Sequence, residues 1–555
     1  MIFFESGAYF WVNIRCRWQK KRNFVRIFVF ENGVQLFFSS YYIHSAMKIF
    51  TTEGIKRIEE ATIESESIKM LDLMERAASA VVYEIISRWH PHKRIVIFAG
   101  PGNNGGDALA VARLLAEQGY RSEVYLFNVK STRLSHCCET NRDRLKSVDR
   151  VNLIEVLDTF TPPELGPNDL VIDGLFGSGL TNPLKGGYAS TVQYINDSDA
   201  FVVSIDIPSG LFGEWNAGTD RRNIIRANLT LAFQFQRLSF FFSENAEFVG
   251  EVVVLDIDMD QNAIASTPTD FYLIERDDVK RQLKPHGEYI NKYDNGTVFL
   301  VAGSYGMMGA ATLAARGAMR AGAGLVTVHA PKCGFVPLAT TVPEVLFEAD
   351  PNEYFTSEIE LHHNYNVVAL GPGMSTTKDA ITAIDSYIKR YRRPCILDAD
   401  ALNCIAMRPV LINSIPKGSI LTPHNSEFDR LFGEHQTDED RLKKAIDVSR
   451  LYEITIVLKG KYTKTVRPDG KVYINSTGNP GLATAGTGDV LTGVIAAFIA
   501  QGYAPDWSVA LGVYVHGLAG DIAVQEQGSH GLIAPDVANA VGKAIQHIIL
   551  NNAID

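Results

Sequence analysis

The run AGTGD at residues 485–489 carries the densest chemical signal in the sequence. Small residues precede Asp489, and the apolar residues after it recur at helical spacing. This pattern predicts that Gly486, Thr487 and Gly488 lie at a helix N-terminus, where backbone amides can hold a phosphoryl group. Asp489 at the junction of loop and helix is suited to accept a proton from an attacking hydroxyl. The plainer alternative is that Asp489 only caps the helix.

Other polar and small residues follow predicted strands in the same part of the chain. Lys459 ends the strand ITIVL and could contact nucleotide phosphates or the adenosine side of a site, although a lysine at a strand end is often only solvated. The four residues that continue this loop are Gly460, Lys461, Tyr462 and Thr463. His424 could contact a substrate and Glu427 could organise Mg²⁺ through water, although a lone histidine is more often structural. Small side chains at Ala310 and Gly373 would allow close approach of a ligand.

A second glycine-rich loop lies in AGPGNNGGD at residues 99–107. It follows a predicted strand and opens a helix, so its amides and the helix dipole can face an anion. It is neither a Walker A loop nor a GxGxxG fingerprint. A tight turn between strand and helix is the structural alternative, but that turn would need only Gly102 and Gly105. The candidate ligand-binding residues of this loop are Asn103, Asn104, Gly105, Gly106 and Asp107.

Two acidic residues in the N-terminal half end predicted strands, Asp173 after DLVI and Asp206 after VVSI. The carboxyl ends of parallel strands meet at one edge of a sheet, so these residues should converge with the glycine-rich loop. Asn104, Asp173 and Ser209 offer only oxygen ligands, which suit a hard cation, including a monovalent one. Asp206 could then move protons. Each aspartate alone could instead be a capping carboxylate.

The elements that must position these residues alternate between strands and helices in both halves, which predicts two α/β domains with largely parallel sheets. In the first half the predicted strands are 94–100, 122–129, 169–177, 200–210, 227–235 and 250–257. A second series begins at 296–304. Residues 261–290 lose the apolar rhythm, so we place the boundary there, with 47–262 as one domain, 263–285 as a linker and 286–555 as the other domain.

The composition excludes several classes of protein. The chain has 555 residues, 46% of them hydrophobic, and a net charge of −10, which argues against a broad surface for nucleic acid. Its six cysteines form no CxxC pair, so we expect neither a disulfide framework nor a zinc finger but a reduced, cytoplasmic setting. We find no stretch of about 20 apolar residues and expect no membrane-spanning helix.

Residues 1–46 do not match the rest of the chain. They are rich in aromatic residues, and basic residues interrupt every apolar run, which is not the pattern of a signal peptide. Met47 opens a segment that reads like an ordinary protein start. We interpret residues 1–46 as a start-site artefact or a non-conforming extension, with a membrane-associated or partner-binding tail as the alternative.

The first half resembles the YjeF N-terminal family, the NAD(P)H-hydrate epimerases, in GPGNNGGD (100–107), DGLFGSGL (173–180) and SIDIPSG (204–210). Ala108 departs from the glycine common at that position. The resemblance implies a Rossmann-like α/β/α sandwich that interconverts the epimers of hydrated NADH and NADPH, and potassium at Asn104, Asp173 and Ser209. It implies ligand contacts at 103–107, at Asp206, and at Gly177, Ser178, Gly179, Leu180, Thr181, Asn182 and Pro183.

The second half resembles the ribokinase-like YjeF C-terminal family, the NAD(P)H-hydrate dehydratases, in AGAGLVTV, TPHNSEF and NPGLATAGTGD. The segment before Gly303 departs from the family pattern. The resemblance implies that Asp489 takes the C6 hydroxyl proton of the S epimer, whose oxygen attacks ADP or ATP in the presence of Mg²⁺. The substrates would be the hydrates of NADH and NADPH with ADP or ATP, and we expect a homo-oligomer with neither nucleic acid nor membrane as partner.

Two other functions fit parts of the sequence. A small-molecule alcohol kinase of the thiazole or pyrimidine type would use the same Asp489 but release a stable phosphorylated product. A non-catalytic nucleotide-binding scaffold would not need Asp206 and Asp489. The attached N-terminal domain favours repair of the hydrated cofactor.

Overall fold

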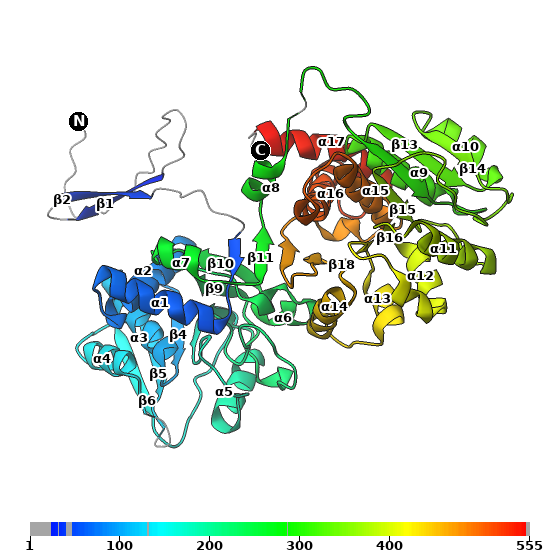
Figure 1. Ribbon diagram of the computed structural model, residues 1–555. Coiled ribbons are helices and arrows are strands. Elements are labelled where there is room, and N and C mark those ends of the chain that lie inside the picture. Colours follow the sequence, from blue (N-terminus) through cyan, green and yellow to red (C-terminus); the bar gives the residue numbers. More distant parts are fainter. Residues whose placement is uncertain (1–23, 31–32, 40–46, 130–132, 286, 551–555) are drawn as a thin grey trace. The chain divides into compact units, whose positions relative to one another are not determined.

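The computed structural model describes residues 24–30, 33–39, 47–129, 133–285 and 287–550. Strands β1 (Phe24–Phe30) and β2 (Gly33–Ser39) pair in antiparallel fashion within a unit that ends at Met47. Most of residues 1–46 lie outside the described residues, so the interpretation of that segment stays a prediction. Everything from Lys48 onward forms a second unit (Figure 1).

The first domain is built on a seven-stranded parallel sheet with the order β10-β9-β8-β7-β4-β5-β6. All six strands predicted in this half are present, and β6 is a seventh that the sequence analysis missed. Their bounds are β4 (Arg94–Ala99), β5 (Ser122–Phe127), β6 (Val151–Val156), β7 (Asp169–Gly174), β8 (Phe201–Ile205), β9 (Leu229–Phe233) and β10 (Glu251–Leu255).

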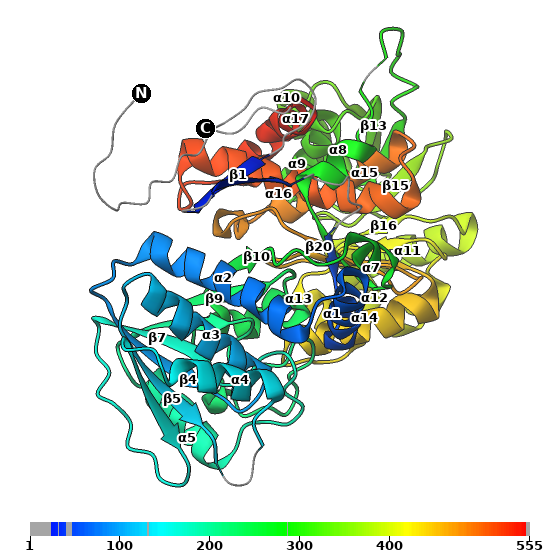
Figure 2. The same ribbon diagram turned by 90° about the vertical axis from the view of Figure 1, so that its left-hand side faces the viewer.

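Helices cover both faces of this sheet. Alternate side chains of β4 enter two separate hydrophobic cores. Ile95 and Ile97 belong to one core, and Val96 and Phe98 belong to the other. Figures 1 and 2 show α3 running alongside β4 and β5. The predicted α/β/α sandwich is therefore confirmed. The helices of this domain are α1 (Thr52–Glu66), α2 (Met70–Arg88), α3 (Asn103–Glu117), α4 (His136–Leu145), α5 (Gly186–Asn196) and α6 (Ala246–Val249).

The segment predicted as a linker, 263–285, contains regular structure. Helix α7 (Gln261–Ser266) precedes strand β11 (Phe271–Ile274), and helix α8 (Arg276–Gln282) follows it. Strand β11 belongs to the second sheet, beside the short strand β3 (Met47–Ile49). The apolar run FYLI is only four residues long and lies among polar residues. The sequence analysis therefore did not predict a strand there.

The second domain is built on a sheet with the order β14-β13-β12-β15-β16-β17-β18-β19-β20-β11-β3. It is parallel from β14 to β18, and then β18, β19 and β20 pair in antiparallel fashion. The remaining bounds are β12 (Thr297–Val301), β13 (Leu325–Ala330), β14 (Leu346–Ala349), β15 (Val367–Leu370), β16 (Ile396–Leu397), β17 (Ile420–Leu421), β18 (Thr455–Leu458), β19 (Lys464–Val466) and β20 (Val472–Asn475).

Helices α9, α15, α16 and α17 pack on one another, and α9 and α15 also contact β12 (Figure 1). Helices α11, α12, α13 and α14 form a second contiguous series. Their bounds are α9 (Met308–Arg320), α10 (Phe335–Thr341), α11 (Lys378–Tyr391), α12 (Ala399–Met407), α13 (Asn425–Phe432), α14 (Asp438–Tyr452), α15 (Thr487–Ala500), α16 (Pro505–Gln527) and α17 (Ala534–Leu550).

Helix α16 is more apolar than the sequence analysis expected. Its stretch Trp507–Gln527 is long and apolar enough to cross a membrane by length and composition, but 78% of its most apolar window is buried inside the protein. A core helix of a soluble fold passes the same test.

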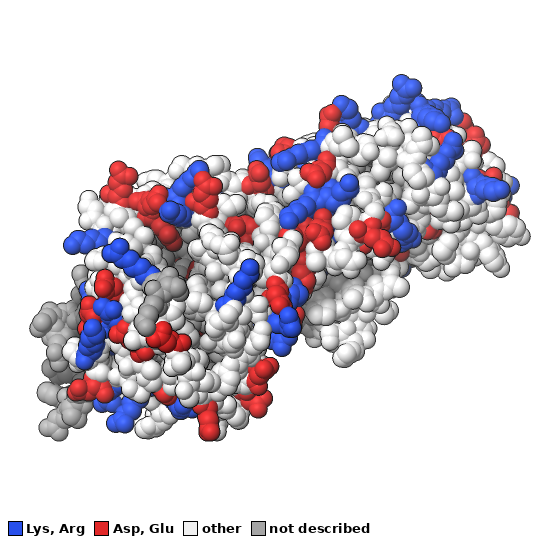
Figure 3. Space-filling view, turned by 90° about the horizontal axis from the view of Figure 1, so that it is seen from below, with Lys and Arg blue, Asp and Glu red and all other residues white. Residues whose placement is uncertain are grey.

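On the face of the molecule seen in Figure 3, basic and acidic side chains are interspersed.

Candidate active sites

The glycine-rich loop at residues 99–107 connects β4 to α3, as predicted, and its backbone is tightly packed. A Cβ atom on Gly105 would stand 1.8 Å from the carbonyl oxygen of Gly100, so only glycine fits there. Asn103 and Asn104 form the first turn of α3. The amides of this turn therefore face the carboxyl edge of the sheet.

Asp173 ties two strands and a loop together. Its side chain is fully buried and accepts hydrogen bonds from Ser209 Oγ (2.5 Å), Ser209 N (2.9 Å) and Ser204 Oγ (2.8 Å). Burial raises the pKa of Asp173, and the bonds from Ser209 oppose that rise. The predicted pairing of Asp173 with Ser209 is thus present in the fold.

Asn104 and Asp206 converge on Gly177. A Cβ atom on Gly177 would lie 3.0 Å from Oδ1 of Asn104 and 3.2 Å from Oδ2 of Asp206. Asn104 is buried, and its Nδ2 has no hydrogen-bond partner among the described residues. The loops that were expected to meet do so.

Several oxygen atoms gather around Asp173. Ser209 Oγ lies 3.1 Å from the carbonyl oxygen of Phe176, so neutral oxygens and one carboxylate gather there. Within the described ranges, no group of three or more His, Cys, Asp or Glu side chains is arranged to hold a metal ion. Oxygen ligands of this kind suit a hard cation.

Asp206 directly follows β8 and adopts a left-handed backbone with φ of 69°. Its Oδ2 accepts a hydrogen bond from Ser178 N at 3.1 Å, and its Oδ1 forms an ion pair with the guanidinium of Arg237. Arg237 is 2% exposed, and its Nε and Nη1 have no partner in the described part of the chain. The sequence analysis missed Arg237, which no local motif marks.

A cavity of about 640 Å³ opens beside these residues. Of the predicted ligand contacts, Gly105, Gly106 and Pro183 are not among its lining residues. Helices α1 and α2 supply a wall that the sequence analysis did not predict, including Glu59, whose spacing from Thr52 and Ile55 places it on one helix face. The predicted residues that line the cavity are Asn103, Asn104, Asp107, Gly177, Ser178, Gly179, Leu180, Thr181, Asn182 and Asp206.

In the second domain, α15 begins where the sequence predicts. Gly486 is its N-cap with φ of 91°, and Asp489 lies in its first turn. Thr487 Oγ1 donates to the carbonyl oxygens of Leu482 (2.9 Å) and Thr484 (3.0 Å), which holds the loop closed. His516 supports the same loop, because its Nε2 lies 2.9 Å from the Thr487 carbonyl oxygen.

Lys459 reaches this helix N-terminus. Its Nζ lies 3.0 Å from Asp398 Oδ1 and 3.8 Å from Glu427 Oε2. A Cβ atom on Gly488 would stand 3.4 Å from the same Nζ. The structure therefore brings Lys459 together with the Gly488–Asp489 junction. Asp398, which the sequence analysis noted only as part of a strand-end loop, is its buried partner.

The other predicted residues of the second domain fall into three places. Ala310 and Gly373 adjoin, since a Cβ atom on Gly373 would lie 2.9 Å from that of Ala310. Gly460, Lys461, Tyr462 and Thr463 form the turn between β18 and β19, closed by a bond from Thr463 Oγ1 to the Gly460 carbonyl (3.0 Å). His424 caps α13 reciprocally with Glu427, so the structural role considered for this histidine is present.

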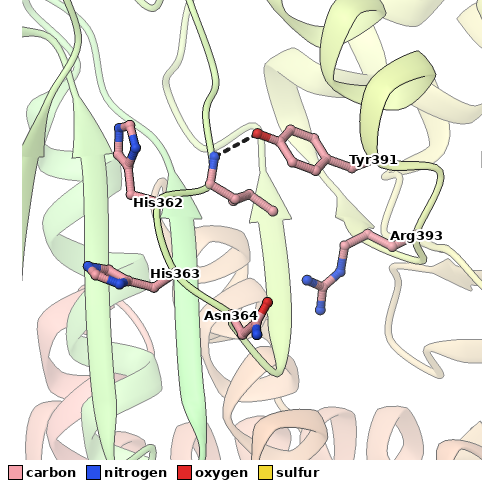
Figure 4. Close-up of a pocket in the computed structure, with 6 residues that line it drawn as sticks. His362, His363, Asn364, Tyr391 and Arg393 are labelled. Atoms are coloured by element: carbon pink, nitrogen blue, oxygen red, sulfur yellow. Dashed lines mark hydrogen bonds between the residues drawn. The ribbon is translucent and has the colours of Figure 1, made fainter.

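A further pocket of about 420 Å³ lies in the second domain (Figure 4). His362, His363, Asn364, Tyr391 and Arg393 line it, and Tyr391 Oη accepts a hydrogen bond from the backbone of Leu361 at 2.8 Å. These residues precede β15 and β16, whereas Asp398 and Gly373 follow them. The pocket thus lies at the amino end of the strands, away from the edge where ligands of such sheets bind.

Comparison with known proteins identifies both domains. Residues 70–239 match the family model of the YjeF-related protein N-terminus, and residues 298–543 match that of NAD(P)H-hydrate dehydratase. A bifunctional NAD(P)H-hydrate repair enzyme from Thermofilum pendens is 33% identical over 514 residues, covering 90% of this chain and 96% of the relative. The chain belongs to the family of bifunctional NAD(P)H-hydrate repair enzymes.

Two further proteins are similar to this family member. The repair enzyme from Moorella thermoacetica is also 33% identical, over 90% of this chain and 97% of the relative. The crystal structure of the ADP/ATP-dependent NAD(P)H-hydrate dehydratase from Bacillus subtilis with ATP and Mg²⁺ is 29% identical, with a TM-score of 0.43, and covers 49% of this chain and 97% of that one. The two family models confirm the predicted pairing of a YjeF N-terminal domain with an NAD(P)H-hydrate dehydratase domain.

The electrostatics of this repair-family member single out Asp489. Burial raises its pKa to about 7, the charge of Asp398 adds to the rise, and Lys459 opposes it. A general base is most effective when its pKa lies near the working pH, so Asp489 is suited to take up a proton at neutral pH.

Lys459 and His516 differ in charge at this site, since Lys459 is positive and His516 is neutral. Burial opposes the charge of Lys459, but Asp398 and Glu427 outweigh burial and raise its pKa. Burial lowers the pKa of His516 to about 4, so this side chain is neutral at pH 7 and can donate to the Thr487 carbonyl. The helix N-terminus therefore carries one fixed positive charge beside one proton acceptor.

Proposed function

We propose that this chain repairs hydrated NADH and NADPH in two steps. The first domain interconverts the R and S epimers at C6 of the nicotinamide ring. The second domain uses ADP or ATP to dehydrate the S epimer and regenerate NADH or NADPH. The second step accepts only the S epimer. A chain that also carries the epimerase domain can therefore repair both epimers of the hydrated cofactor.

The first step is assigned to the cavity beside Asp206. We assign the substrate contacts to residues 103–107, to residues 177–183 and to Asp206, which moves a proton. Asn104, Asp173 and Ser209 would hold potassium. When bound, potassium would supply a positive charge that fixes the loops around the substrate. The support is the all-oxygen donor set and the convergence of Asn104 and Asp206 on Gly177.

The second step is assigned to the N-terminus of α15. Asp489 takes the proton of the C6 hydroxyl, and the hydroxyl oxygen attacks the terminal phosphoryl group of ADP or ATP. The bond from that phosphorus to the bridging oxygen breaks, and AMP or ADP leaves. The ring nitrogen then expels phosphate, and loss of a proton from the neighbouring ring carbon restores the dihydronicotinamide. The amides of Gly486, Thr487 and Gly488 and the charge of Lys459 stabilise the phosphoryl oxygens.

The remaining contacts of the second site follow from its position. Ala310, Gly373 and His424 would contact the hydrated nicotinamide, and residues 459–463 the nucleotide. Mg²⁺ would supply charge neutralisation of the nucleotide phosphates, held through water by Glu427. That carboxylate already caps α13 and faces Lys459, which is consistent with contact through water rather than direct ligation.

The observation that carries this proposal is a proton acceptor with a pKa of about 7 beside a lysine at a glycine-rich helix N-terminus, in a chain that also holds the cavity around Asp206. The test is to mix the purified chain with the S hydrate, Mg²⁺ and either nucleotide. Free phosphate together with recovered dihydronicotinamide absorbance is the expected result. A stable phosphorylated alcohol would instead identify a small-molecule kinase.

We also propose a cytoplasmic, homo-oligomeric enzyme. The described cysteines are all free, and four of the five are buried, as expected in a reducing compartment. Light scattering of the purified chain tests the oligomer, and cell fractionation tests the compartment.

A further inference from the structure

Helix α1 brings a second carboxylate to the cavity that holds Asp206. Thr52, Ile55, Lys56 and Glu59 recur at three- and four-residue steps and all line the cavity. Asp206 enters the same cavity from the carboxyl end of β8. Four carboxylates line this ligand space, Glu59, Glu60, Asp107 and Asp206. Glu59 and Asp206 reach it from unrelated elements.

The two carboxylates have opposite surroundings. Asp206 has the buried guanidinium of Arg237 on one oxygen and the amide of Ser178 on the other, and both contacts suit an ionised carboxylate. Burial raises the pKa of Glu59 to about 7, and the charges of Asp206 and Glu60 add to the rise while Arg237 and Lys56 oppose it. Near pH 7 Glu59 is therefore about half protonated and can both give and take up a proton.

The other acids near the cavity are poorly suited to this cycle. Asp107 is buried, and burial together with the charges of Asp206 and Glu59 raises its pKa well above the usual range. Glu60 is exposed to solvent. Glu59 alone combines a position on the cavity wall with partial burial.

We propose that Glu59 is a catalytic acid that works with Asp206 as the base in the interconversion of the C6 epimers. This inference rests on the proposed epimerase function and adds a residue to it. Pairs of acids whose surroundings separate their protonation states are a recurring way to run acid and base chemistry in one site.

Interconversion of the epimers proceeds by loss and return of one water molecule at C6. Glu59 gives its proton to the C6 hydroxyl, the C6–O bond breaks, water leaves, and the lone pair of N1 forms an N1=C6 double bond. Water then adds to the opposite face of C6, the π electrons return to N1, and Asp206 accepts the proton released by that water. Glu59 and Asp206 recover their starting states by proton exchange with solvent.

The test uses the full chain without nucleotide, so that only epimerisation occurs, and follows conversion of the R hydrate to the S hydrate by chromatography. Glu59→Gln should lower this rate by about 100-fold or more, because glutamine cannot give up a proton. The matched control is Glu64→Gln, which alters an exposed carboxylate on the same helix and should change the rate less than about twofold. With nucleotide added, dehydration of the S hydrate should be unaffected in both variants.

The pH dependence separates a catalytic role from a structural one. For the unaltered chain, kcat/KM of epimerisation should fall as pH rises above about 7, where Glu59 loses its proton. Glu59→Asp keeps a titrating acid and should retain that fall at a reduced rate, whereas the residual activity of Glu59→Gln should lack it. Full epimerisation in Glu59→Gln, or an unchanged alkaline fall in its residual activity, would overturn the inference. Absence of epimerisation in the unaltered chain would overturn the proposed function itself.

Discussion

Lys459 Nζ lies 3.0 Å from Asp398 Oδ1, although 61 positions separate the two residues in the chain. Asp398 is buried, and its other oxygen accepts a hydrogen bond from Thr492 Oγ1 in α15 at 2.6 Å. Asp398 therefore connects two strand-end loops to the helix that carries Asp489. This connection holds the ammonium group against Gly488, where the proposed reaction needs a positive charge.

Lys459→Met should lower kcat of dehydration by about 100-fold, the usual loss when one charge-stabilising donor is removed. It should also change the pH profile. Lys459 lowers the pKa of Asp489, so its loss raises that pKa and moves the rising limb of activity to higher pH. The measurement is kcat/KM for the S hydrate across the pH range. A variant with lower activity but the same rising limb would contradict the coupling between these two residues.

Asp489→Asn should abolish dehydration and leave epimerisation intact. In the unaltered chain, kcat/KM of dehydration should rise through about pH 7, because the base works only when ionised.

Asp489 also affects the stability of the folded chain. Its folded pKa is raised above the unfolded value, so its contribution to stability is fully present below the unfolded pKa and is lost as pH rises through about 7.

Asp489→Asn should therefore unfold at a higher temperature than the unaltered chain at pH 8, where the parent carries a costly buried charge. Dehydration assays and thermal melts at pH 5 and pH 8 test both statements together. ADP-dependent recovery of NADH at the parental rate would rule out Asp489 as the base.

Arg237→Met should destabilise the first domain and stop epimerisation. Both members of the Arg237–Asp206 pair are buried, and removing one partner of a buried pair costs about 3–5 kcal/mol. Hydrogen exchange of peptides from β7 and β8 measures this loss directly. The double variant Arg237→Met/Asp206→Asn should recover much of the stability but none of the activity, because it removes the stranded charge together with the base. Equal exchange in the single variant and the parent would show that the pair does not hold the fold.

The sequence predicts strand-end residues far better than their partners. Asp173 and Asp206 could be located because each follows a run of apolar residues, and Asp489 because it lies between a glycine-rich run and an apolar helix. Arg237 could not, since it reaches Asp206 through the tertiary fold from a loop without a motif. Lys459 was located, but its ion pair with Asp398 depends on which strands become neighbours.

Two of the strands that the sequence analysis did not predict share a physical cause. Strands β11 and β20 are only four residues long and sit among polar residues, so their apolar pattern is too short to detect, and their pairing with each other depends on contacts between distant segments. Glu59 was overlooked for a different reason. A carboxylate on a helix is normally assigned to solvent, and only the packing of α1 over the sheet turns it toward the cavity.

Epimerisation should depend on potassium, and Asn104 should set that dependence. Asn104 is buried, and its Oδ1 would lie 3.0 Å from a Cβ atom placed on Gly177. Replacing potassium with choline should slow conversion of the R hydrate. Asn104→Ala removes one neutral oxygen ligand and should raise the half-saturating potassium concentration about 10-fold, the effect expected for loss of about 1.4 kcal/mol of binding. Asn152→Ala, at an exposed position in β6, is the matched control and should leave the potassium response unchanged. An identical potassium response in Asn104→Ala and the parent would place the cation elsewhere or remove it from the reaction.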